Sequence, residues 1–508
     1  MKKIVWLLLG YCAHFTISSA QTGVLDNRLV GLDKQVAALL IDYHAAGVAI
    51  AIIENGEITY SEGFGYRDFE QKLPVDGNTV FGIGSVTKSF TASLLGILED
   101  KGHLSLSDKP SKYIPTLRFY HPAMDHAIRI KNLLTHSTGI PSYDSECSSV
   151  IFQSTDKAAL IPRLAHLKPT AQVGDRFMYV NYMYTIAGII GERITGKSWA
   201  NNLSSLVLEP LQMKNTYPDY HQAKHAANFS LAYAVDKNKP VEILPEAIVT
   251  RAPAGNIYST VNDMAKWVKT WINGGRYGDQ QIFSTAYRDA AIRPQQIIHG
   301  GPQPTKAKQA QFFNYGYGWF NGTYHGYYKV EHSGGVSGYS SNVAFFPTED
   351  LGIIVLTNQN TSGLAFKITD IITHKLLKLD WVEEDAEAPI FGKVIAVVPP
   401  HTPTLIDTKR PTTHPLEDFT GKFSHPAFGE VLVSLKEKVL LAKFPYTSFR
   451  LNHKAYNTFD TQFIEKVPQV ISSAFFVLNF RTDFDGQINS VMINVSGEED
   501  VEFLRVKE

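Results

Sequence analysis

A serine and a lysine one helical turn apart could form a nucleophile and its activator. Ser85 and Lys88 belong to the segment Ser-Val-Thr-Lys, which follows Gly84 and opens an apolar run that ends near Gly102. On a helix, residues i and i+3 lie on one face, so the Lys88 ammonium would reach the Ser85 hydroxyl. An isolated hydroxyl is a poor nucleophile near neutral pH. The pair therefore predicts an activated serine nucleophile, with a simple helix cap at Ser85 as the alternative.

The same spacing occurs a second time, at Ser154 and Lys157. Ser154 precedes Thr-Asp and is typical of an ordinary helix cap. Ser85 instead follows the flexible Phe-Gly-Ile-Gly segment at residues 81–84 and leads into an apolar helix. We therefore prefer Ser85 as the nucleophile.

Two further motifs follow Ser85 along the chain. Tyr179 and Asn181 form a Tyr-x-Asn, and residues 331–335 read Glu-His-Ser-Gly-Gly, which supplies a His-x-Gly at His332 on a predicted strand. Each has a structural alternative. A lone tyrosine more often packs as an aromatic side chain, an asparagine often marks a turn, and two strand glycines are typical of a bulge or of close backbone approach.

The three motifs in this order resemble the serine β-lactamase and penicillin-binding-protein superfamily, particularly class C β-lactamases, D-alanyl-D-alanine carboxypeptidases, D-aminopeptidases and related esterases. The resemblance covers residues 30–380 and includes companion segments at residues 79–91, 133–141, 253–255, 259–260 and 315–319. A looser resemblance links the C-terminal segment to the β-barrel domain that follows some of these hydrolases.

The resemblance implies catalytic roles for Ser85, Lys88 and Tyr179. The serine would attack a carbonyl, and the lysine and tyrosine would share the removal of its proton, since a phenol with a reference pKa of about 10 needs a neighbouring ammonium to act as a base. Asn181 would donate to the substrate's amide oxygen, and the backbone N–H groups of Ser85 and Gly335 would hold the oxyanion. The implied substrate-binding and oxyanion residues are Asn181, His332, Ser333, Gly334 and Gly335.

His332 departs from the Lys-Thr-Gly of penicillin-recognising relatives, whose lysine helps to hold a substrate carboxylate. A histidine of ordinary pKa, about 6.5, is mostly neutral at higher pH. The resemblance therefore implies a secreted serine hydrolase that forms an acyl-Ser85 intermediate on D-amino-acid peptides or on esters. A β-lactamase or D-Ala-D-Ala carboxypeptidase is an alternative. A penicillin- or peptide-binding module without turnover is the non-enzymatic alternative, which has no need for a nucleophile beside its activators.

Other reactive residue types provide no competing site. His136 lies in Thr-His-Ser-Thr-Gly, and we interpret it as a structural hydrogen-bonding residue rather than a base. Cys147 lies in a polar stretch and would be the sole cysteine once an export signal containing Cys12 is removed, so no intrachain disulfide is expected. No metal-ligand motif occurs, and neither a metal nor a cofactor is expected.

Charge and the first residues bear on partners and location. The formal net charge is -1, with 48 basic and 49 acidic residues and no basic block, which argues against nucleic acid as a partner. Two lysines before the apolar residues 4–9, with small residues at Ser18 and Ala20, predict a removed export signal at residues 1–20 and a periplasmic or extracellular protein. The apolar run is too short to span about 30 Å of hydrocarbon, so no stable membrane span is expected. A bulky residue before Cys12 disfavours lipidation.

Hydrophobic periodicity predicts an α+β fold for residues 21–382, in which early and late strands meet in one sheet. A hairpin should turn at Asn55-Gly56. With the resemblance, this becomes a β-lactamase/transpeptidase-like antiparallel sheet flanked by helices. The predicted helices are residues 27–44, 85–101 and 366–379, and the predicted strands are residues 47–53, 58–64, 331–335, 342–346 and 351–356.

Repeated prolines predict a stiff linker at residues 383–414. Short strand-like runs with a turn at Asp485-Gly486 then predict a small all-β barrel, lipocalin-like, at residues 415–508. This domain is the candidate site of self-association. Its predicted strands are residues 430–434, 439–444, 475–480, 488–495 and 501–506.

Overall fold

The computed structural model describes residues 26–142, 156–245, 251–300, 312–360, 363–380, 410–445, 447–464, 477–494 and 500–507. The predicted export signal at residues 1–20, Cys147, Ser154 and most of the predicted linker lie outside the described residues. Within those residues, no helix combines the length and the apolar character needed to cross a membrane.

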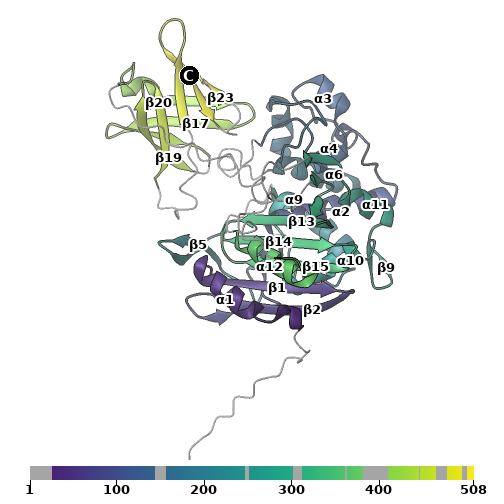
Figure 1. Cartoon of the computed structure of the whole chain (residues 1–508). Coiled ribbons are helices and arrows are strands. Elements are labelled where there is room, and N and C mark those ends of the chain that lie inside the picture. The colour runs from purple at the N-terminus through teal and green to yellow at the C-terminus, as the bar shows by residue number, and fades with distance from the viewer. Residues whose placement is uncertain are drawn as a thin grey trace, which may run out of the picture.

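A nine-stranded antiparallel sheet carries the first folded unit, in the order β10-β11-β12-β13-β14-β15-β1-β2-β3. Figure 1 shows β13, β14, β15, β1 and β2 of this sheet. The N-terminal strand β1 thus pairs with β15 from the far end of this unit, as predicted. The strands are β1 (Gly47–Glu54), β2 (Glu57–Asp68), β3 (Leu73–Pro74), β10 (Gln296–Gly300), β11 (Phe312–Tyr315), β12 (Phe320–Tyr324), β13 (Tyr327–Val336), β14 (Tyr339–Phe346) and β15 (Leu351–Thr357).

The predicted hairpin between β1 and β2 is confirmed. Asn55 and Gly56 have φ values of 52° and 77°, so both turn residues adopt the left-handed conformation that a two-residue hairpin turn of type I′ requires. Alternate residues of β1 then enter two different cores. Ala49 and Ala51 face one apolar cluster, whereas Ile50 and Ile52 face another, because successive side chains of a strand point to opposite faces.

Helices cover both faces of the sheet. α1 (Leu32–Asp42) and α12 (Leu364–Leu377) pack on the face that holds Ile50, whereas α2 (Thr87–Asp100), α6 (Asn181–Thr195) and α10 (Val261–Ile272) contribute to the core on the other face. The first predicted helix is interrupted at Gly31, whose φ of 78° separates a 3-10 helix from α1. The remaining helices are α3 (Pro122–Ala127), α4 (Ile130–Leu134), α7 (Trp199–Leu203), α8 (Tyr220–Ala223), α9 (Ala252–Gly255) and α11 (Thr285–Ile292).

Shorter elements complete this unit. Two-stranded pairs form between β4 (Phe81–Gly82) and β7 (Tyr258–Ser259), between β5 (Ala232–Asp236) and β6 (Lys239–Ile243), and between β8 (Arg276–Tyr277) and β9 (Gln280–Gln281). 3-10 helices lie at Asn27–Leu29, Gly84–Val86, Pro110–Lys112 and Ala158–His166, and a π-helical turn lies at Ser204–Leu208.

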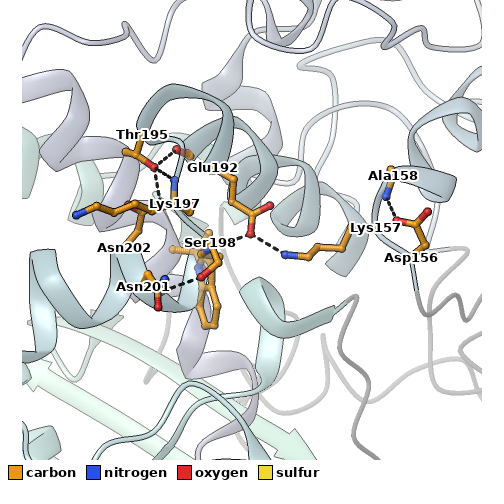
Figure 2. Close-up of polar contacts among 12 residues, drawn as sticks. Asp156, Lys157, Ala158, Glu192, Thr195, Lys197, Ser198, Asn201 and Asn202 are labelled. Carbon is orange, nitrogen blue, oxygen red and sulfur yellow. Dashed lines mark hydrogen bonds and ion pairs between the residues drawn. The ribbon is translucent and has the colours of Figure 1, made fainter.

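The connection from α6 to α7 is held by buried and half-buried polar contacts. Glu192 accepts hydrogen bonds from Lys157 Nζ (2.7 Å) and from the backbone N–H of Trp199 (2.8 Å), and Figure 2 shows the Lys157 contact. The indole N–H of Trp199 donates to Thr91 Oγ1 in α2 (3.0 Å), and Thr91 donates to the carbonyl oxygen of Pro253 (2.6 Å). These bonds join α7 to α6, α2 and α9, and the last three carry residues of the site described below.

The C-terminal segment forms a closed barrel of eight antiparallel strands, which confirms the all-β prediction. Its strands are β16 (Gly421–His425), β17 (Gly429–Lys436), β18 (Val439–Lys443), β19 (Ser448–Ala455), β20 (Thr458–Phe463), β21 (Val477–Thr482), β22 (Ile488–Asn494) and β23 (Asp500–Arg505). Strands β16, β19 and β20 were not predicted, because polar residues such as His425, His453 and Thr461 stand in step with the inward apolar residues and shorten the alternating pattern. The interior is packed with phenylalanines, among them Phe423, Phe449 and Phe503.

Candidate active site

Ser85 lies on a tight turn pressed against the central sheet. It belongs to the 3-10 helix Gly84–Val86 that leads directly into α2, and its side chain is half-buried. Gly84 has a φ of 52°, and a Cβ atom at this position would lie only 2.5 Å from the backbone nitrogen of Gly335. Glycine therefore allows the turn that carries Ser85 (the Ser85 turn, Gly84–Val86) to approach β13 as closely as it does.

Lys88 joins three elements through its ammonium nitrogen. The residue is fully buried, and Nζ lies 2.9 Å from Ser85 Oγ, 2.7 Å from Asn181 Oδ1 and 2.8 Å from the carbonyl oxygen of Ala254. Three acceptors match the three donors of an ammonium group, which offsets much of the cost of burying the charge. Ala254 has no role predicted from the sequence, although residues 253–255 are one of the companion segments of the resemblance.

Tyr179 and Asn181 reach the same lysine from the start of α6. Lys88 Nζ lies 4.7 Å from the centroid of the Tyr179 ring, within cation–π range. Asn181 is the first residue of α6, and its Oδ1 faces the lysine. The structure therefore brings Ser85, Lys88, Tyr179 and Asn181 together, although Ser85 and Asn181 are far apart in the sequence.

The two glycines of β13 have different surroundings. Pairing between β13 and β14 continues without a register shift from Val330 to Val336, so no bulge is present there. A Cβ atom on Gly334 would lie 1.9 Å from the carbonyl oxygen of Ile83, whereas a Cβ on Gly335 would have no neighbour within 4 Å. Gly334 is thus the position of close backbone approach, and Gly335 lies beside it with its backbone against the Ser85 turn.

Gly334→Ala should destabilise the protein, and Gly335→Ala should not. The added methyl group at position 334 would overlap the backbone of Ile83 and force β13 away from the Ser85 turn, at a cost of about 2 kcal/mol or more. At position 335 the methyl group enters open space, and a change within about 0.5 kcal/mol is expected. Urea unfolding of the two variants measures the difference, and equal midpoints would contradict the described contact.

His332 is fully buried, and both of its ring nitrogens have protein partners. Nδ1 lies 2.6 Å from the carbonyl oxygen of Ser333, and Nε2 lies 2.9 Å from the Tyr315 hydroxyl. A carbonyl oxygen only accepts, so Nδ1 carries the hydrogen and Nε2 accepts from Tyr315. Burial, and then the charge of Lys88, lower the pKa of His332 to about 3. The ring is therefore neutral, and a direct contact between His332 and substrate stays a prediction.

Tyr315 is a further site residue to which the sequence analysis assigned no role. It ends β11, is fully buried and also packs against His136 at a centroid distance of 5.0 Å. Its position in the companion segment at residues 315–319 was the available signal. Within the described ranges, no group of three or more His, Cys, Asp or Glu side chains is arranged to hold a metal ion.

Comparison with solved structures defines the class of fold. The chain is similar to the octameric penicillin-binding protein homologue from Pyrococcus abyssi, with a TM-score of 0.61 and 22% identity, covering 93% of this chain and 99% of that chain. The fold is therefore the antiparallel sheet and flanking helices of the β-lactamase and penicillin-binding-protein class, followed by a closed barrel.

The Beta-lactamase family model matches residues 32–375, and the chain belongs to this family. A second model, a domain of unknown function called DUF3471, matches residues 407–507.

Two curated relatives are each 27% identical to this chain. Protein flp of Staphylococcus aureus (strain MW2) aligns over 344 residues, which are 65% of this chain and 64% of that protein, so the chain spans slightly less than two thirds of its length. Unguisins hydrolase ungD of Aspergillus violaceofuscus (strain CBS 115571) aligns over 437 residues, which are 80% of this chain and 77% of that protein.

Proposed function

We propose that this protein is a serine hydrolase that forms an acyl-Ser85 intermediate on D-amino-acid peptides or on esters. The observation that carries the proposal is the 2.9 Å contact between Lys88 Nζ and Ser85 Oγ, made by a buried lysine at the start of a helix. Family membership and the similarity to a protein named as a hydrolase support the same reaction class.

The partners of Lys88 suit it to proton transfer. The amide oxygen of Asn181 and the carbonyl oxygen of Ala254 can only accept hydrogen bonds, whereas the Ser85 hydroxyl can also donate one. Once Lys88 has lost one proton, its neutral amine can keep donating its two hydrogens to these two oxygens and use its lone pair to take the proton from Ser85. The resulting ammonium lies beside Tyr179, which would share this transfer and the return of the proton to the leaving group.

In the acylation step, a bond forms between Ser85 Oγ and the carbonyl carbon, and the bond from that carbon to the leaving nitrogen or oxygen breaks. The leaving group takes up the proton that Ser85 lost. Backbone N–H groups of Ser85 and Gly335 would hold the intermediate oxyanion, in keeping with the close approach of the Gly335 backbone to the Ser85 turn. In the second step, water attacks the carbonyl carbon of the acyl-Ser85 ester and gives its proton to Lys88 and Tyr179. These residues return a proton to Ser85 Oγ as the bond from Oγ to the acyl carbon breaks.

The state of His332 favours substrates without a free carboxylate near this strand. Its ring is neutral and already bonded to Tyr315 and Ser333, so it offers no positive charge to an anion. We therefore expect amides and esters without a free carboxylate to be better substrates than D-Ala-D-Ala peptides and β-lactams, which remain the alternative substrates. A penicillin- or peptide-binding module without turnover remains the non-enzymatic alternative.

The ratio of kcat/KM for a carboxylate-free amide to that for its carboxylate-bearing analogue should stay constant between about pH 5 and 8. A histidine with an ordinary pKa of about 6.5 would become cationic as the pH falls and would then favour the carboxylate. With its pKa lowered to about 3, His332 stays neutral across this range. Paired kinetics at several pH values measure the ratio, and a rise in carboxylate preference below pH 6.5 would contradict the assignment.

A fluorescent phosphonate and a set of substrates test the proposed reaction. The purified protein should acquire one covalent label, which peptide mapping places on Ser85. It should also turn over D-amino-acid amides, D-Ala-D-Ala peptides, p-nitrophenyl esters or nitrocefin, and their relative rates identify the substrate class. A protein that binds penicillin or peptide without releasing product would instead be a binding module.

Location and assembly form a separate part of the proposal. The composition of residues 1–20 supports export to the periplasm or the extracellular space, and N-terminal sequencing of the mature protein should then begin at Gln21. The similarity to the octameric penicillin-binding protein homologue supports self-association. The C-terminal barrel is our candidate region for this contact. Light scattering of the full chain determines its mass in solution.

A further inference from the structure

A buried histidine outside the three motifs contacts the Tyr-x-Asn segment twice. His136 follows α4 and has a φ of 55°. Its carbonyl oxygen accepts the backbone N–H of Met178 (2.7 Å), and its ring Nδ1 accepts the backbone N–H of Val180 (3.1 Å). Val180 lies between Tyr179 and Asn181, so His136 is bonded on both sides of the tyrosine. The predicted hydrogen-bonding role of His136 is thus confirmed, and its partners are the backbone N–H groups on either side of Tyr179.

The protonation state of His136 makes this bond possible. Full burial, and then the charge of Lys88, hold the pKa of His136 well below its ordinary value. The ring is therefore neutral, and since Nδ1 accepts from Val180, the hydrogen lies on Nε2. Nε2 has no hydrogen-bond partner among the described residues. The available lone pair is thus committed to Val180, so His136 is not placed to take a proton from Ser85.

The ring of His136 also packs on Tyr179 directly. Their centroids lie 4.3 Å apart with an interplanar angle of 37°, and Tyr184 and Tyr315 lie 5.2 and 5.0 Å from the same imidazole. The ring and the hydrogen bond together restrain both the side chain of Tyr179 and the backbone that leads to Asn181. These are the two residues of the segment that contact Lys88.

We propose that His136 is a positioning residue that sets Tyr179 and Asn181 against Lys88 through its Nδ1 hydrogen bond to Val180. The inference rests on the proposed acyl transfer, in which Lys88 and Tyr179 move the proton of Ser85. It predicts that loss of the Nδ1 acceptor lowers catalysis although no atom of His136 reacts. A displacement of catalytic groups by about 1 Å can cost on the order of 10²-fold in rate.

Two substitutions separate the acceptor from the ring. His136→Asn retains an acceptor oxygen at the position of Nδ1 along the side chain, and asparagine tolerates a φ of 55°. His136→Phe retains an aromatic ring but has no acceptor for the Val180 N–H. We expect His136→Phe to lower kcat by roughly 10- to 100-fold with KM changed by less than about twofold, and His136→Asn to stay within about fivefold of the wild type.

His374 provides a matched control for the loss of any buried histidine. It lies in α12, is 4% exposed, and its Nε2 is 3.0 Å from the Tyr324 hydroxyl. Its apolar neighbours in α12 belong to the core cluster on one face of the sheet. The apolar residues of α2, which carries Lys88, belong to the cluster on the other face. His374→Phe should lower the midpoint of thermal unfolding and leave kcat per folded molecule unchanged.

The measurements are steady-state kinetics on a p-nitrophenyl ester and thermal unfolding of the full chain. The inference is overturned if His136→Phe keeps the wild-type kcat, or if folded His136→Asn loses as much activity as folded His136→Phe. If His136→Phe does not fold, near-wild-type kcat in His136→Asn supports the inference, and a loss of 10-fold or more overturns it. Failure of the proposed function would differ, because wild-type protein would then neither turn over substrate nor label at Ser85.

Discussion

Ser85→Ala should lose at least about 10³-fold in kcat while the protein keeps its fold. The alanine removes the only atom that forms a bond to the substrate in the proposed mechanism. Because Ser85 is half-buried and its hydroxyl contacts Lys88, deletion of one oxygen should change stability by no more than about 2 kcal/mol. Turnover of the best substrate, phosphonate labelling and thermal unfolding measure these effects.

Ser154→Ala is the matched control, since it removes the serine of the second Ser-x-x-Lys in the same chain. It should leave both turnover and labelling unchanged. A loss at Ser154 comparable to that at Ser85 would show that the nucleophile was chosen wrongly. Substantial residual turnover in Ser85→Ala would refute the acyl-Ser85 intermediate.

Lys88→Ala and Tyr179→Phe should each lower kcat by about 10²-fold or more, because both residues act on the proton of Ser85. Tyr179→Phe keeps the ring that packs on His136 and lies near Lys88, so its effect isolates the hydroxyl group. Lys88→Ala also leaves Asn181 and the Ala254 carbonyl without the ammonium they share, and should destabilise the protein as well.

The double variant distinguishes a shared proton path from two separate contributions. If the residues form one unit, the combined loss should be close to the larger single loss rather than the product of the two. Single-turnover acylation rates on folded protein provide the comparison. A multiplicative loss would mean that lysine and tyrosine contribute independently, and the shared-base mechanism would be wrong.

Sequence patterns predicted the helices, strands and turns whose conformation depends on residues adjacent in the chain. Asn55-Gly56 favours left-handed backbone at both positions, and the hairpin there follows from that preference. The apolar run after Ser85 predicted α2, and the short spacing to Lys88 predicted contact between the two side chains. β16, β19 and β20 were not predicted because His425, His453 and Thr461 stand at positions where an alternating pattern requires apolar residues.

The sequence by itself thus determined the composition of the candidate site: a serine and lysine on one helical turn, a tyrosine and asparagine, and a strand with two glycines. Only the tertiary structure decided which backbone contacts, protonation states and hydrogen-bond partners these residues have. Gly334 and Gly335 are chemically identical, yet only Gly334 meets backbone at close range. His332 is neutral because burial, and then the charge of Lys88, lower its pKa, and Tyr315 from another strand is the hydrogen-bond partner of its Nε2. The third acceptor of Lys88 is the carbonyl oxygen of Ala254, and a backbone oxygen has no signature in the sequence because every residue has one.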